Sequence, residues 1–167
     1  MTQSLLSRRS VLVGASATAG LSACSRPPQR LYTDHVFIQK EMRRMYLLNQ
    51  GIPVAEYKID LGFAPEGHKL MEGDGRTPEG TYRIDRRNPN SSFYLSVGID
   101  YPNEQDIARA EELGVSPGGD IFIHGQPTGK WRMGDPDWTA GCIAVQNRDI
   151  EQIYVSVALG TPVTITA

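Results

Sequence analysis

Short apolar stretches, separated by residues that favour turns, follow one another along most of the chain. Segments 36–38, 44–48 and 53–61 predict β-strands, because apolar side chains recur along them at short spacing and a turn-forming Asn-Gln-Gly precedes the third. Further strands are predicted at residues 81–85, 93–99, 121–124, 142–146 and 162–166. We therefore expect a mainly β domain built from antiparallel strands.

Two segments have the signature of short helices. In segment 103–113, Asn103 can cap the first turn, acidic residues follow it, and Gly114 can end the helix. Asn147 can cap a second helix that runs to about residue 158. We find neither an internal repeat nor a linker, so we expect these helices to belong to the same domain as the strands.

The composition excludes several classes of function. The chain has 167 residues, of which 40% are hydrophobic and 22% charged, as is typical of one globular domain. A net charge of −2 offers no basic surface, so we expect no nucleic-acid partner. The glycines of segment 72–80 lack the spacing of a phosphate-binding loop, and no Lys-Ser/Thr pair follows them. We expect no cofactor.

The N-terminal segment has the features of an export signal. Arg8 and Arg9 precede an apolar stretch over residues 11–21, which is shorter than the roughly 20 residues that span a bilayer. Residues 21–24 read Leu-Ser-Ala-Cys and match a lipobox, in which the cysteine receives a diacylglycerol and becomes the new N-terminus. Cys24 is therefore a candidate site of lipidation.

These features divide the chain into a signal peptide (1–23), a lipidated polar tether (24–34) and a folded domain (35–167). The paired arginines resemble a twin-arginine signal, which exports folded proteins, but they also fit the basic end of a general secretory signal. With either route we expect a domain of the periplasm or cell envelope, anchored by lipid to a membrane that faces the periplasm.

Lipidation of Cys24 would leave Cys142 as a lone thiol in an oxidising compartment. A lone cysteine is either a small buried apolar residue or a reactive group. The sequence before it favours the second reading, because a predicted strand ends at His124. Alternation puts this histidine on the face opposite the strand's isoleucines, and it does the same for Cys142 in the later strand. The two side chains could therefore face each other across neighbouring strands.

This pair predicts nucleophilic chemistry. A thiol reacts as thiolate, and a histidine can act as its base because it titrates near working pH. We therefore expect an activated thiolate at Cys142, paired with His124. The backbone N–H groups around Ala140 and Gly141 could hold an oxyanion, and backbone at Gly125 could orient the imidazole. One cysteine and one histidine do not make a zinc site, so we expect no metal.

The residues around this pair resemble a known family. His124-Gly125, followed by Thr139-Ala140-Gly141-Cys142-Ile143, is similar to the signature of the L,D-transpeptidase (YkuD-like) catalytic domain. Segments 73–82 and 117–119 add to the resemblance, which extends over residues 36–165. It implies a β-sandwich or barrel of antiparallel strands with two short helices.

The resemblance also implies an activity on peptidoglycan stem peptides. In this family the cysteine attacks a carbonyl between an L-centre and a D-centre, forms a thioester, and passes the acyl group to an amine. By the match, Cys142 would be the nucleophile, His124 the general base and acid, and Gly141 part of the oxyanion loop.

One position departs from the family pattern. Many members have Arg or Asn where this chain has Ala144. In those members the Arg or Asn side chain helps to hold the substrate. Arg132 or Arg148 could hold the substrate in place of that side chain. Trp131 and Trp138 predict either a wall of the substrate groove or lids packed on the core. The candidate substrate-binding residues are Thr139, Trp131, Arg132, Trp138 and Arg148.

Three functions stay open on the sequence. The first is an L,D-transpeptidase, and the second is an L,D-carboxypeptidase or amidase that uses the same thiol and passes the acyl group to water. The third is a non-catalytic lipoprotein that binds the cell wall, against which the presence of both Cys142 and His124 argues. The first two differ in whether the acceptor site admits an amine or water.

Overall fold

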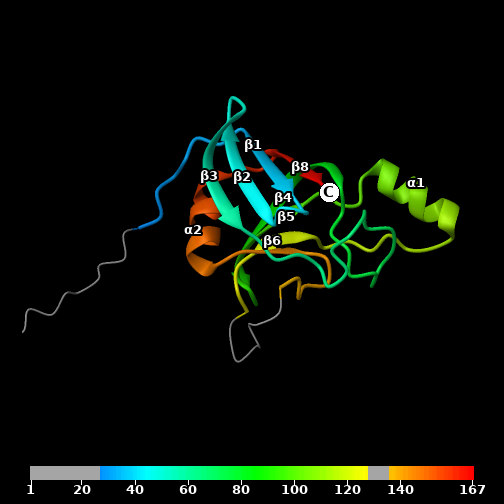
Figure 1. The fold of residues 1–167 in the computed structure, drawn as a ribbon. Helices are drawn as coiled ribbons and strands as arrows, with labels where there is room; N and C mark the ends of the chain where they lie inside the picture. Colours follow the sequence, from blue (N-terminus) through cyan, green and yellow to red (C-terminus); the bar gives the residue numbers. More distant parts are fainter. Residues whose placement is uncertain (1–26, 128–135) are drawn as a thin grey trace, which may run out of the picture.

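The computed structural model describes residues 27–127 and 136–167, and within these ranges the chain forms eight strands and two helices (Figure 1). The strands are β1 (His35–Gln39), β2 (Arg44–Asn49), β3 (Ile52–Lys58), β4 (Gly80–Ser91), β5 (Tyr94–Ile99), β6 (Phe122–His124), β7 (Ile143–Ala144) and β8 (Pro162–Thr166). The helices are α1 (Glu104–Leu113) and α2 (Asn147–Ser156). The prediction of a mainly β domain with two short helices is confirmed. Neither described helix is long and apolar enough to cross a membrane.

The described strands form one sheet in the order β3-β2-β1-β8-β4-β5-β6-β7. Most neighbours are antiparallel, as expected, but β8 lies parallel to β1 and β7 lies parallel to β6. The sheet is therefore mixed. Parallel neighbours require a connection that returns the chain to the same end of the sheet, and apolar patterns within single strands do not reveal such returns.

The two ends of this strand order meet. Asp60 follows β3, and it exchanges two backbone hydrogen bonds with Ala144 of β7, each 2.9 Å long. Beside them, the N–H of Phe63 donates to the carbonyl of Thr139 (2.9 Å), whose own N–H donates to the carbonyl of Leu61 (3.1 Å). The sheet therefore closes nearly into a barrel, and the segment after β3 supports the residues that precede β7.

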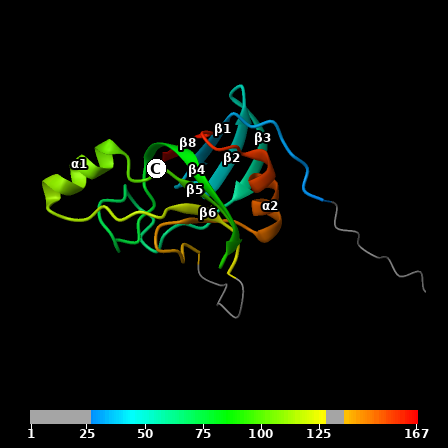
Figure 2. The same cartoon turned by 180° about the vertical axis from the view of Figure 1, so that it is seen from behind.

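Aliphatic side chains fill the interior of this sheet. Ile38, Leu47 and Ile123 are fully buried, and α2 adds Ile150 from one side. The two helices lie on opposite sides of the strands in both views (Figures 1 and 2). Each such side chain contributes about 1.5–3 kcal/mol when it leaves water. This core gives the loops at the sheet's edge a rigid base.

The ends of the helices follow the predictions only in part. Asn103 caps α1 and forms a capping box with Asp106, and Gly114 ends the helix in the left-handed conformation (φ 67°), as predicted. The predicted cap of α2 is wrong: Gln146 is the N-cap residue and Asn147 is the first helical residue. The Asn147 side chain instead accepts a hydrogen bond from the N–H of Gln126 (2.7 Å), which ties the chain after β6 to the helix.

Candidate active site

The predicted base ends one strand, and the predicted nucleophile immediately precedes the neighbouring strand. His124 ends β6, opposite Ser96 on β5 and beside Ala144 on β7. Paired residues share one face of a sheet and alternate residues return to it, so Phe122 lies on the face of His124. Cys142, which immediately precedes β7, comes next to Phe122 on the same face by continuation of the register.

One cavity connects these side chains. It has a volume of about 280 Å³, and both His124 and Cys142 line it. Its other lining residues are mostly small and polar: Asn88, Ser91, Ser92, Phe93, Ser96, Asp120 and Phe122. The structure thus brings together the two residues that the sequence placed on separate strands. Hydroxyl and amide groups around them suit the hydrogen-bonding groups of a peptide.

The thiol of Cys142 is half-buried and held by backbone. Its Sγ donates to the carbonyl of Asp120 and accepts from the N–H of Phe122, both over 3.4 Å. Burial raises the pKa of the Cys142 thiol above its ordinary value, although the N–H of Phe122 opposes this effect. These surroundings favour the neutral thiol at neutral pH and disfavour the activated thiolate expected from the sequence.

The imidazole of His124 is fixed in one tautomer. Its Nδ1 lies 2.7 Å from the carbonyl oxygen of Gly125, which can only accept, so Nδ1 carries the proton and Nε2 keeps its lone pair. Burial lowers the pKa of His124, and the bond to Gly125 opposes this effect. The ring is 3% exposed and neutral at neutral pH. It is therefore ready to accept a proton.

Two aromatic rings cover this imidazole. The Phe93 centroid lies 4.5 Å from the centroid of His124, and Trp138 meets the imidazole at a steep angle of 68° with centroids 5.7 Å apart. The indole N–H of Trp138 donates to Oδ2 of Asp60 over 3.2 Å. Trp138 was a candidate for substrate binding or for a lid on the core, and in the structure it packs on the base itself.

The thiol and imidazole do not form a hydrogen bond with each other in the described structure. Both groups are neutral, because burial disfavours each charged form. Transfer of a proton from Cys142 to His124 would require a change in these surroundings. Apo sites commonly have long catalytic contacts that tighten on binding.

Thr139 holds the turn before the nucleophile. Its hydroxyl donates to the carbonyl of Cys142 (2.7 Å) and accepts from the N–H of Gly141 (3.1 Å). Thr139 is only 4% exposed and does not line the cavity, so its place differs from the substrate contact expected of it. Its position indicates a structural role in the turn.

The same turn sets which N–H groups can hold an oxyanion. Gly141 has φ 130°, and a Cβ there would lie 2.7 Å from the carbonyl oxygen of Arg76, so this position requires glycine. Its N–H is already used by Thr139, which removes it from the expected donors. Within the described chain the N–H groups of Ala140 and Cys142 donate to no acceptor, and they remain available.

The other candidate substrate residues fall elsewhere. The side chain of Arg148 is 81% exposed on α2, pairs with Asp149 at 3.4 Å and does not line the cavity. Trp131 and Arg132 lie outside the described residues. Ala144 is fully buried, so its strand offers no side chain to hold a substrate.

Sequence reasoning missed the acidic residues that support the site. Asp137 accepts three hydrogen bonds from the guanidinium of Arg43 (2.6–3.1 Å) and one from the N–H of Leu61 (3.0 Å). Asp60 binds the indole of Trp138. These contacts join residues far apart in the chain, and a single sequence contains no local signal for them. Among the described residues, no three His, Cys, Asp or Glu side chains gather as metal ligands would.

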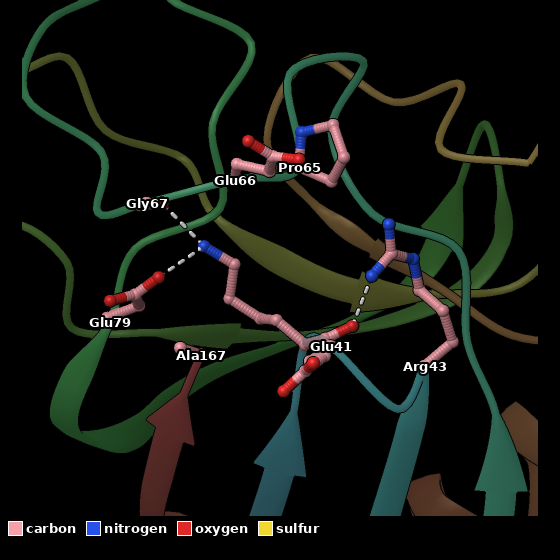
Figure 3. A pocket seen from close by; sticks show the side chains of 8 residues that line it. Glu41, Arg43, Pro65, Glu66, Gly67, Glu79 and Ala167 are labelled. Carbon is pink, nitrogen blue, oxygen red and sulfur yellow. Dashed lines mark hydrogen bonds and ion pairs between the residues drawn. The ribbon is translucent and has the colours of Figure 1, made fainter.

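A larger cavity, of about 350 Å³ (Figure 3), shares no lining residue with this site. Lys40 lines it, is 2% exposed, and donates to Glu79, to Thr77 and to Gly67. Its three N–H donors are therefore all used within the protein. Neither Cys142 nor His124 reaches this cavity, and its buried cation has a structural explanation.

Comparison with known proteins gives one consistent result. Residues 33–165 match the family model of the L,D-transpeptidase catalytic domain. The protein YafK of Escherichia coli K12, whose name places it with the L,D-transpeptidases, is 31% identical over 134 residues, covering 75% of this chain and 48% of YafK.

Solved structures agree with this match. The helical cell shape determining protein Pgp2 of Campylobacter jejuni is 28% identical with a TM-score of 0.62, covering 84% of this chain and 51% of Pgp2. Bd1075 of Bdellovibrio bacteriovorus is 25% identical with a TM-score of 0.58, covering 81% of this chain and 48% of Bd1075. The chain thus spans about half the length of these relatives.

Proposed function

Because the chain belongs to the family of L,D-transpeptidase catalytic domains, we propose that it is a cysteine acyltransferase that acts on the stem peptides of peptidoglycan. The observation that supports this most directly is the shared cavity, in which a thiol and a neutral imidazole lie beside a turn with two unused backbone N–H groups. A nucleophile, a base and oxyanion donors are the groups that acyl transfer requires.

The first step would be acylation of Cys142. As the donor peptide enters, Nε2 of His124 takes the thiol proton while Sγ attacks the scissile carbonyl carbon. The oxyanion that forms would accept hydrogen bonds from the N–H groups of Ala140 and Cys142. When the carbon–nitrogen bond breaks, the imidazolium returns its proton to the leaving amine, and a thioester remains on the enzyme.

The second step would release the acyl group. An acceptor amine attacks the thioester, gives a proton to Nε2 of His124, and the carbon–sulfur bond breaks. The thiolate of Cys142 then recovers this proton from the imidazolium. Gly125 holds the ring in the tautomer that both steps need, because its carbonyl keeps the other proton on Nδ1.

We also propose that the domain works at the periplasmic side of a membrane, tethered through Cys24. The support is the basic, apolar and lipobox pattern of residues 1–24. Residues 1–26, including Cys24, lie outside the described residues. A substrate located in the cell wall agrees with this location.

Products of the purified domain test this function. Tetrapeptide muropeptides are incubated with residues 27–167 and with the Cys142→Ala variant, and the products are identified by mass spectrometry. Cross-linked dimers formed only by the wild type support transfer to an amine. Shortened peptides alone would assign the domain to the carboxypeptidases, and unchanged muropeptides would contradict both activities.

A further inference from the structure

Ser96 occupies a special place in the cavity of Cys142. It lies on β5 directly opposite His124, and both side chains line the cavity. Directly opposed residues in an antiparallel pair have Cβ atoms about 4.5–5.5 Å apart. Because β5, β6 and β7 are neighbours in that order, Ser96 and the Cys142 element flank His124 from opposite sides.

Among the described residues, the hydroxyl of Ser96 has no hydrogen-bond partner. Its residue is 4% exposed, yet Oγ forms no hydrogen bond within the described ranges. Among the described residues, every side-chain nitrogen or oxygen that is fully shielded from water has a hydrogen-bond partner. Because Oγ of Ser96 has none, it is not fully shielded and remains open to the cavity. Its donor and its acceptor are therefore free for a group that enters the cavity.

Other hydroxyls near this region are engaged. Oγ of Ser91, in the same cavity, accepts from the N–H of Phe93 (3.1 Å), and the hydroxyl of Thr139 makes two bonds within its turn. Ser156 is buried to the same 4% as Ser96, but its Oγ accepts from the N–H of Leu31 over 3.0 Å. Ser96 thus differs from a buried structural serine in lacking a partner within the described ranges, and from Ser91 in lying opposite the base.

We propose that Ser96 binds the acceptor and orients it for the second step of the proposed reaction, on which this inference rests. An attacking amine, or water, has two hydrogens and one reactive lone pair. One hydrogen faces Nε2 of His124 and the other is accepted by Oγ of Ser96, so the lone pair points at the thioester of Cys142. The new carbon–nitrogen bond forms, the carbon–sulfur bond breaks, and the first hydrogen passes as a proton to His124.

The test separates the two chemical steps. A tetrapeptide muropeptide serves as the donor, and a tripeptide muropeptide, which has the acceptor amine but lacks the scissile bond, serves as the acceptor. Intact-protein mass spectrometry follows how fast the acyl group appears on Cys142 and, after removal of free donor and addition of fresh acceptor, how fast it leaves. The variants are Ser96→Ala and, as the matched control, Ser156→Ala, and the melting temperature of each is recorded.

For Ser96→Ala we expect acylation within about 2-fold of wild type and release of the acyl group slower by about 2- to 10-fold, the range of one uncharged hydrogen bond. Its melting temperature should not fall, since the hydroxyl has no partner to lose among the described residues. Ser156→Ala should lower the melting temperature and leave both rates unchanged. Three results for Ser96→Ala would overturn the role of Ser96. They are an equal slowing of acylation and release, an unchanged rate of release, and a lower melting temperature with both rates unchanged. A wild type that never acquires an acyl group would instead contradict the proposed function, and the inference would fall with it.

Discussion

The indole of Trp138 packs against the imidazole of His124, with ring centroids 5.7 Å apart, and its N–H is held by Asp60 at 3.2 Å. The contact links the segment after β3 to the base at the end of β6. Since Gly125 fixes one ring nitrogen and Trp138 covers the ring, rotation of the imidazole is restricted from two directions. Proton transfer depends on such orientation.

Removing this contact should affect catalysis more than binding. We expect Trp138→Ala to lower kcat at least about 10-fold through misorientation of His124, with a smaller change in KM, and to lower the free energy of unfolding by about 2 kcal/mol. Trp138→Phe keeps a ring against the imidazole and should retain most activity. Steady-state kinetics and urea denaturation measure the two effects. A rise in KM with kcat unchanged would mean that Trp138 binds substrate instead.

The turn before the nucleophile gives a second prediction. Thr139→Val keeps the shape of the side chain but leaves the N–H of Gly141 and the carbonyl of Cys142 without their partner. We expect a loss of about 2 kcal/mol in stability and about 10²-fold in kcat, because the oxyanion donors lie in this turn. Thr139→Ser retains the hydroxyl and should behave like the wild type. Full activity of the valine variant would show that the turn does not need this hydroxyl.

The raised pKa of Cys142 predicts a slow thiol at neutral pH. Burial disfavours the thiolate, so iodoacetamide should alkylate Cys142 more slowly than a free cysteine at pH 7, with a rate that rises only above the ordinary thiol pKa of about 8.5. His124→Ala should change this resting rate little, because no bond joins the two groups before substrate binds. The measurement uses residues 27–167, in which Cys142 is the only cysteine. Fast alkylation at pH 7 that depends on His124 would reveal a preformed ion pair.

The N-terminal segment gives a prediction that needs no structure. Cys24→Ala should block lipidation, leave the precursor unprocessed at the lipobox, and release the domain from the membrane fraction. Metabolic labelling with a fatty acid and fractionation of cells check both outcomes. A mature-sized product that stays at the membrane without label would contradict the proposed anchor.

The sequence predicted elements where local chemistry determines them. Segment 162–166 has the bounds of β8, and Asn103 and Gly114 mark the ends of α1, because strand and cap patterns are local. In contrast, β4 continues to Ser91, well past the predicted residue 85, through exposed polar residues that pair with β5 and leave no apolar signal. Strand pairing, not residue type, extends this strand.

The site was predictable to a similar degree. The alternation of apolar residues indicated that His124 and Cys142 share a face, and both line one cavity. Their charge states were not predictable, because both pKa shifts come from burial in the folded protein. The position of Ser96 opposite His124 was not predictable either, because it depends on the register between β5 and β6. Long-range pairing determines each of these features.

The proposed reaction requires a thioester between Cys142 and a stem peptide, and this species can be trapped. Residues 27–167 are mixed with tetrapeptide muropeptide, quenched in acid, digested with pepsin and mapped by mass spectrometry. We predict an acyl adduct on the peptide that contains Cys142, removable by hydroxylamine, as expected of a thioester. It should be absent from Cys142→Ala and formed at least about 10²-fold more slowly by His124→Ala, the lower range for general base catalysis. Product formation by the Cys142→Ala variant, or an adduct on another residue, would show that Cys142 is not the nucleophile.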